Sequence, residues 1–267
     1  MLNRNLRKSL LFVLFSLLLS GAALAVTHFT EVRALYVIIL AYFIGPAISA
    51  FLVEKIMSNE NPLKTLDINF VFNLWSISAI VAPLALLPLA FGVGLLMPET
   101  SIAQARFDIM AVIKSVLVGG TVLAIIAFFA VVGFAGLLFK ELVYLGFWRS
   151  SYITGIFAAL WLAPLLYMMS LYDAAYTLKG LVMILPFVIA VFPVLTFFKC
   201  KTKNIFVPSI MTGIIFATAA FPFDLIFGGE VLLLGYNGVA GILAASIIAA
   251  IIFVYNRFLT EAYKRIY

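Results

Sequence analysis

Residues Phe129–Pro164, FAVVGFAGLLFKELVYLGFWRSSYITGIFAALWLAP, join two apolar segments through a short charged hinge. The hinge, Lys140–Ser150, contains Lys140, Glu141 and Arg149, whereas the segments on either side carry no charge. Such a pattern is typical of two membrane helices joined where the chain leaves the hydrocarbon. The stretch therefore predicts two spans and a connection at the membrane surface.

The whole chain has the composition of a polytopic membrane protein. Of its 267 residues, 66% are hydrophobic and 10% are charged, and the mean hydropathy is +1.22. Soluble domains are nearer half apolar and a quarter charged. Lipid offers no hydrogen-bond partners to the backbone, so long apolar runs are expected to be helices. We expect an all-α membrane protein with a single polytopic domain, residues 1–267.

Eight apolar runs are expected to span the membrane. They cover about residues 10–26, 34–52, 71–97, 111–139, 151–171, 178–198, 205–227 and 235–255. Prolines lie within several of these runs, and Pro83, Pro88, Pro186 and Pro193 predict broken helices.

The positive charges fall mostly on one side of this layout. In an eight-span chain, 13 of the 17 Lys and Arg residues lie in the N-terminal segment, the even-numbered loops and the tail. The other side has Arg33, Arg106, Lys114 and Lys179. Cytoplasmic loops carry an excess of Lys and Arg, so both termini are expected in the cytoplasm. This count fits best if the first span is retained, although Ala23-Leu24-Ala25 mimics a signal-peptidase site and leaves cleavage open.

The sequence contains few residues that could form a catalytic or metal-binding site. The net charge of +6 reflects the loop charges and is not a nucleic-acid footprint. The single His28 excludes a multi-histidine metal site, and the single Cys200 excludes a cysteine-based metal site and an internal disulfide. The middles of the spans lack paired carboxylates and a Ser–His pair. We expect no metal and no cofactor.

A few residues remain as candidates for a groove or binding site: Glu141, Trp148, Arg149, Trp161 and Thr212. Most also have a structural interpretation. Glu141 is expected to offset Lys140 or Arg149 at the interface. Trp148 fits an interfacial aromatic belt, and Trp161 either packs between helices or contacts a ligand.

The chain resembles the CPBP intramembrane proteases, also called the CAAX prenyl protease 2-like or ABI family. The resemblance rests on blocks in the same order and spacing, namely Gly45-Pro46-Ala47, Lys140-Glu141-Leu142, residues 145–151, Thr154-Gly155, residues 160–164 and residues 201–213. It covers most of the chain, with a core at about residues 111–257. It implies a CAAX-protease-like bundle in a prokaryotic cytoplasmic membrane. The family activity is intramembrane endopeptidase, in which a glutamate activates water while histidines and an asparagine hold the water and the oxyanion.

Every catalytic position of that family is substituted here. The glutamates fall on Ala130 and Val131, the arginine on Ala135, the histidines on Leu162 and Thr212, and the asparagine on Phe216. We call these six the substituted positions. Together they read as a polar cavity refilled with mostly apolar side chains, so the resemblance implies no peptidase activity.

The leading expectation is therefore a non-catalytic membrane protein, a pseudoprotease. It would bind or scaffold a membrane partner, or an apolar or prenylated peptide, within the lipid bilayer, and would not bind nucleic acid. The alternative is a transporter or lipid-handling protein on the same fold, motivated by the proline breaks. A third is an active CAAX-type endopeptidase with a displaced site. A catalytic role for Glu141 is the alternative to its structural interpretation, although Glu141 lies about three helical turns from the first glutamate position of the family.

Overall fold

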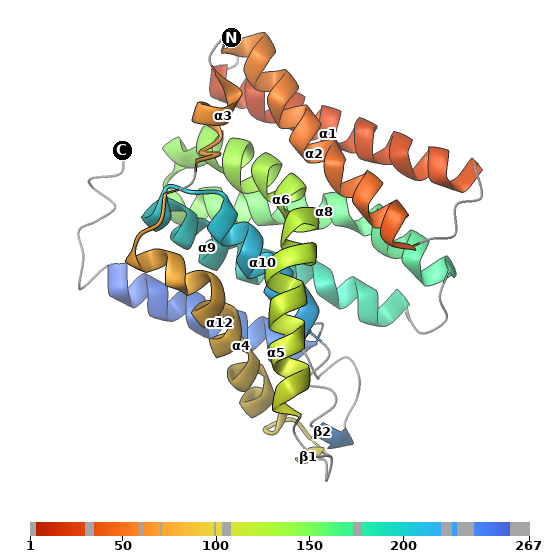
Figure 1. Ribbon diagram of the computed structural model, residues 1–267, viewed down its shortest axis with the longest axis vertical. Helices are drawn as coiled ribbons and strands as arrows, with labels where there is room; N and C mark the ends of the chain where they lie inside the picture. Colours follow the sequence, from red (N-terminus) through yellow and green to blue (C-terminus); the bar gives the residue numbers. More distant parts are fainter. Residues whose placement is uncertain are drawn as a thin grey trace.

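The computed structural model describes residues 4–29, 35–58, 61–69, 71–98, 100–102, 108–172, 178–219, 226–228 and 238–256. Nearly all of this part of the chain is helical (Figure 1). The longer helices are α1 (Arg4–Phe29), α2 (Leu35–Met57), α4 (Ser78–Gly94), α5 (Ile109–Val118), α6 (Ala124–Val131), α8 (Phe147–Tyr172), α9 (Leu178–Thr202), α10 (Phe206–Thr218) and α12 (Val239–Val254). Short helical turns are α3 (Pro62–Thr65), η1 (Leu74–Ile77), α7 (Phe139–Leu142) and η4 (Val143–Leu145). Two three-residue strands, β1 (Thr100–Ile102) and β2 (Ile226–Gly228), pair antiparallel.

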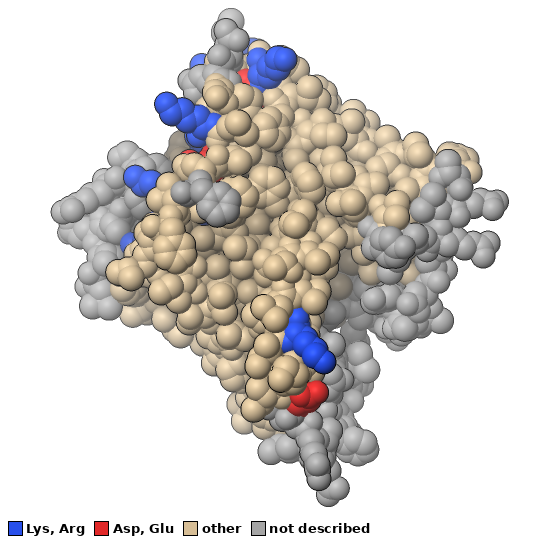
Figure 2. Space-filling view, viewed as in Figure 1, with Lys and Arg blue, Asp and Glu red and all other residues tan. Residues whose placement is uncertain are grey.

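The chain is an all-α protein whose helices have the length and composition of membrane spans. Within the described residues, six helical segments are long and apolar enough to cross a bilayer, where eight spans were expected. The other two apolar runs also form helices, but α10 has 13 residues and α12 has 16. Each borders a segment that lies outside the described residues. On the face shown in Figure 2, charged side chains lie at the top, along the upper left edge and near the bottom, and the centre of the face is uncharged.

Two helices extend further than the sequence predicts. The second apolar run is expected to end at about residue 52, but α2 continues to Met57 and buries Glu54. The sixth apolar run is expected to end at about residue 198, but α9 continues to Thr202 and includes Lys199 and Lys201. In both places an ion pair neutralises a charge near the helix end, which removes the reason for the helix to stop.

The predicted helix breaks do not occur. Pro83 and Pro88 lie inside α4, and Pro186 and Pro193 lie inside α9. A proline removes one backbone hydrogen bond from a helix. In an apolar surrounding the other backbone carbonyls have no partners except the N–H groups of the next turn, so the helix continues past the proline. Both helices therefore remain continuous.

The expected fourth span is one continuous helical segment, Ile109–Leu145. Two π-helical stretches interrupt its α-helical geometry, η2 (Gly119–Leu123) and η3 (Val132–Leu138). At η2 the backbone comes very close to α10, and a Cβ on Gly119 would lie 2.7 Å from the carbonyl oxygen of Gly213. Only glycines permit this approach.

Buried side chains form two clusters. One joins α1, α2, η3 and α8, and the other joins α4, α9, α10 and α12. Helix α6 and its π-helical continuation pack against α2 on one side and α10 on the other. Ala130, Val131 and Ala135, three of the substituted positions, therefore lie in the middle of the bundle.

Candidate functional site

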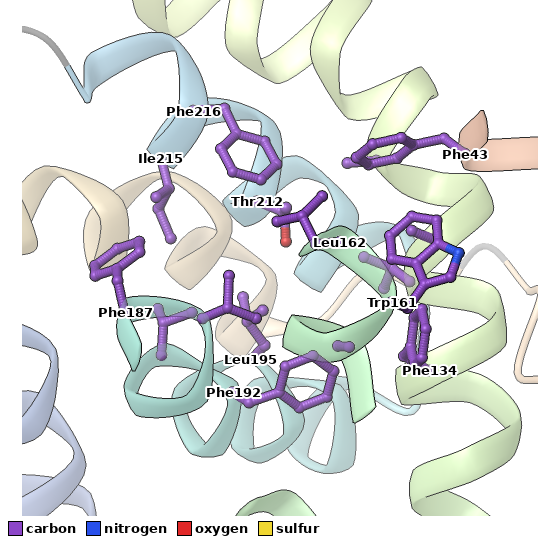
Figure 3. A pocket seen from close by; sticks show the side chains of 16 residues that line it. Phe43, Phe134, Trp161, Leu162, Phe187, Phe192, Leu195, Thr212, Ile215 and Phe216 are labelled. Carbon is purple, nitrogen blue, oxygen red and sulfur yellow. The ribbon is translucent and has the colours of Figure 1, made fainter. Parts of the chain in front are cut away.

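Five of the six substituted positions surround one cavity (Figure 3): Ala130, Val131, Leu162, Thr212 and Phe216. They come from α6, α8 and α10, which are far apart in sequence. In Figure 3 the side chains of Leu162, Thr212 and Phe216 point toward the same space. The sixth position, Ala135, is buried in η3 and does not line the cavity.

The cavity is small and apolar. Its volume is about 70 Å³, well below the ~300–1,000 Å³ of small-molecule sites. The other lining residues are Phe43, Ala127, Phe134, Ala158, Trp161, Phe187, Val188, Val191, Phe192, Leu195 and Ile215. None of these described lining residues is ionisable. A cavity of this kind stays dry.

The two polar groups on the cavity lining already have partners. The Thr212 hydroxyl donates to the Pro208 carbonyl at 2.8 Å, and the Trp161 indole N–H donates to the Ser20 hydroxyl at 2.9 Å. Neither the O–H nor the N–H is therefore left to donate to an oxyanion inside the cavity.

Trp161 packs between helices and also forms a wall of the cavity. Its ring stacks on Tyr42, with centroids 4.7 Å apart and planes at 29°, and meets Phe43 edge-on at 5.2 Å. The Tyr42 hydroxyl donates to the Trp161 carbonyl. With the bond to Ser20, these contacts attach α8 to both α1 and α2.

Glu141 does not offset Lys140 or Arg149, and the expectation that it would is wrong. Its carboxylate accepts a hydrogen bond from the Lys8 ammonium at 2.7 Å. Lys140 instead donates to the Thr65 carbonyl at 2.8 Å, and Arg149 is exposed. Lys140 and Glu141 are neighbours on a helix, so they point in different directions.

A second carboxylate completes a buried ionic group. Lys8 also donates to Glu54 at 3.0 Å, and Lys8, Glu54 and Glu141 are only 6%, 1% and 7% exposed. One oxygen of Glu54, Oε2, has no hydrogen-bond partner among the described atoms. The three residues come from α1, α2 and α7, so the ionic group ties three helices together. The sequence does not reveal this ionic group, because Lys8 and Glu54 each flank an apolar run, as ordinary interfacial charges do.

The candidate residues therefore divide into two sets. Trp161 and Thr212 line the cavity, whereas Glu141, Trp148 and Arg149 do not. Trp148 is half-buried, and its ring packs edge-on against Phe253 at 5.5 Å.

The described residues contain no group of three His, Cys, Asp or Glu side chains that could hold a metal ion. The His28 side chain lies outside the described part of the chain, and Cys200 is half-buried and free.

Comparison with protein-family models gives no match for this chain, and comparison with curated proteins gives none either.

Proposed function

We propose that this protein is a non-catalytic CPBP-like membrane scaffold, a pseudoprotease that holds a membrane partner instead of cleaving it. The observation that carries the proposal is the convergence of five substituted positions on one apolar cavity. The resemblance predicts that these positions lie together, whereas a chain without that fold would have no reason to bring three separate helices together at them. Their meeting supports the view that a former catalytic centre has been refilled.

The cavity has none of the groups that peptide hydrolysis requires. A general base must lie within hydrogen-bond reach of the attacking water, and the oxyanion needs donors. Glu141 is the carboxylate nearest in sequence to Ala130, Val131 and Ala135. It is paired with Lys8 and does not line the cavity. This pairing counts against an active enzyme with Glu141 as the base.

The size of the cavity favours scaffolding over binding a peptide in the old groove. A volume of about 70 Å³ is too small for a prenyl chain or a peptide segment. The partner would instead meet the outer surface of the bundle. The transporter alternative loses its motivation, because α4 and α9 run through their prolines without a break.

For the topology we propose eight crossings with both termini in the cytoplasm of a prokaryotic cell. Helix α10 is only about 20 Å long, but it packs against α4, α5, α6 and α9. A short helix enclosed by protein does not need to match the bilayer thickness by itself. The excess of Lys and Arg on one side supports the orientation.

The test is a cleavage assay with the purified full chain in lipid vesicles. Prenylated CAAX-type peptides and transmembrane peptides are added, and products are followed by mass spectrometry. We expect no product from the native chain or from Glu141→Gln. Cleavage by the native chain that Glu141→Gln abolishes would overturn the proposal.

A binding measurement separates the scaffold from a peptide receptor. A fluorescent prenylated peptide should show no saturable binding that depends on the cavity. Saturable binding to the native chain that is lost in Ala158→Phe and kept in Ala85→Phe would favour the old groove as a receptor site. Ala158 lines the cavity, whereas Ala85 is an exposed alanine on α4.

A further inference from the structure

A polar pocket, separate from the apolar cavity, lies between α3 and the hinge. Its volume is about 400 Å³, within the usual range for small-molecule sites. Four described residues line it, and all four are polar: Asn61, Lys64, Thr65 and Lys140. We call it the basic pocket. In Figure 2, Lys and Arg side chains lie beside the place that α3 occupies in Figure 1.

Two segments far apart in sequence form the basic pocket, and hydrogen bonds fix them. Asn61 caps α3, because its side-chain oxygen accepts from the backbone N–H of Leu63 at 3.0 Å, and Pro62 begins the helical turn. The Lys140 ammonium, from α7, donates to the Thr65 carbonyl at 2.8 Å. The walls of the pocket are therefore held together by the protein itself.

The basic pocket has hydrogen-bond donors that no described residue uses. An ammonium has three N–H donors, and Lys140 uses one of them on Thr65. Lys64 is exposed, and its ammonium makes no hydrogen bond to a described residue. The Asn61 side chain uses its oxygen for the cap, which leaves its NH₂ group as a donor. These groups suit a ligand that accepts several hydrogen bonds.

The charge of the basic pocket is not neutralised within the described part of the chain. Asp67 and Glu141 are the described carboxylates nearest in sequence to its lysines, and both are paired elsewhere. Asp67 lies 2.5 Å from the Lys199 ammonium, and Glu141 accepts from Lys8. No described carboxylate forms an ion pair with either lysine of the pocket. Because like charges repel, an anion bound between the two lysines would be stabilised.

We propose that the basic pocket binds a phosphate group, held by the ammonium groups of Lys64 and Lys140 and by the Asn61 amide. Lysine is a common phosphate ligand in proteins. The pocket lies where two long apolar helices end, α2 at Met57 and the Ile109–Leu145 segment shortly after Lys140. The phosphate therefore belongs either to the headgroup of an anionic phospholipid at the bilayer surface or to a phosphate in solution. The proposal is independent of the scaffold function, because it concerns different residues.

The test uses the full chain, purified in detergent and stripped of lipid, in isothermal titration calorimetry. The probes are soluble dihexanoyl phosphatidylglycerol, dihexanoyl phosphatidylcholine and inorganic phosphate, each titrated separately. Phosphatidylglycerol should bind more tightly than phosphatidylcholine, whose choline neutralises its phosphate. Binding of phosphatidylglycerol without binding of inorganic phosphate assigns the pocket to a lipid headgroup. Binding of inorganic phosphate assigns it to the phosphate group itself.

A matched pair of lysine variants locates the site. Lys64→Gln should weaken the bound probe roughly fivefold, and Lys64→Arg, which keeps the charge, should weaken it less. Lys55→Gln is the control, because Lys55 is exposed on α2 and does not line the basic pocket. It removes the same charge from the surface and should leave the affinity unchanged.

Asn61→Asp tests the amide without removing the cap. Aspartate caps a helix as well as asparagine does, but it replaces the NH₂ donor with a negative charge. It should weaken the bound probe at least as much as Lys64→Gln. Three results would each overturn the proposal: no binding of phosphatidylglycerol or inorganic phosphate, equal weakening in Lys64→Gln and Lys55→Gln, or unchanged affinity in Asn61→Asp.

Discussion

The ammonium of Lys8 lies 2.7 Å from a carboxylate oxygen of Glu141, and the pair joins the first helix of the chain to the hinge after η3. Both side chains are buried, and Glu54 shares the same ammonium. Buried charges are costly unless they are paired, and removing one member leaves the others uncompensated. The first helix is therefore an integral part of the bundle.

The first prediction concerns this ionic group. Lys8→Met should lower the free energy of unfolding by about 3–5 kcal/mol, because it strands two buried carboxylates. The measurement is equilibrium unfolding of the purified protein in mixed micelles with increasing SDS. Arg7→Met is the matched control, since Arg7 is exposed on the same helix, and it should change stability by less than about 0.5 kcal/mol. Equal losses in the two variants would contradict the pairing.

The sequence predicts where the helices lie, because the length of an apolar run determines whether it forms a membrane helix. Runs of about 18 apolar residues form helices wherever the structure describes them, because an unpaired backbone is too costly in an apolar surrounding. The helix ends near Glu54 and Lys199 were not predictable. Each is extended by a partner distant in sequence, Lys8 for Glu54 and Asp67 for Lys199.

The lining of the cavity was predictable in part, and this prediction came from the resemblance and not from apolar length. The resemblance selected positions such as Ala130 and Leu162, and the structure places five of the six around one cavity. Nothing in the sequence pattern indicated how small the cavity is, since that depends on the packing of Phe43, Phe187 and Phe192 from other helices.

The second prediction tests the refilled cavity. Ala130→Glu restores the residue type that the resemblance places there, but it puts a carboxylate where no described lining residue can pair with it. It should destabilise the protein by several kcal/mol and should produce no peptidase activity. Ala130→Leu, of similar length and uncharged, should cost no more than about 1–3 kcal/mol. If SDS unfolding shows that Glu is tolerated as well as Leu, the cavity is not dry.

The third prediction concerns the contact between η2 and α10. Gly213→Ala should destabilise the protein by about 1–3 kcal/mol, because the added Cβ would lie 2.5 Å from the backbone nitrogen of Ala124. Alanine otherwise stabilises a helix relative to glycine by about 0.5–1 kcal/mol. Gly21→Ala, which has open space around it, should show that gain in the same unfolding titration. A gain at Gly213 as well would mean that the two helices do not touch.

The fourth prediction concerns the bond between α1 and α8. The indole N–H of Trp161 donates to the Ser20 hydroxyl, and that hydroxyl donates to the Tyr42 carbonyl at 2.9 Å. Ser20→Ala leaves the buried indole N–H and one carbonyl without this partner. Hydrogen bonds between membrane helices contribute about 0.6–2 kcal/mol, and leaving a buried donor unpaired adds to the loss. We expect a total loss of about 1–3 kcal/mol in SDS unfolding.

Ser246→Ala is the control for this fourth prediction. Ser246 is exposed on α12, and its hydroxyl donates to a carbonyl of its own helix, Ile242, at 2.7 Å. Its removal breaks a hydrogen bond of the same type without separating two helices, so stability should change by less than about 0.5 kcal/mol. The tryptophan fluorescence of Ser20→Ala should also shift, because the Trp161 indole loses its hydrogen bond, while that of Ser246→Ala should not. If the two variants behave alike in both measurements, Ser20 does not hold Trp161, and Trp161 is held by its contacts with Tyr42 and Phe43 of α2.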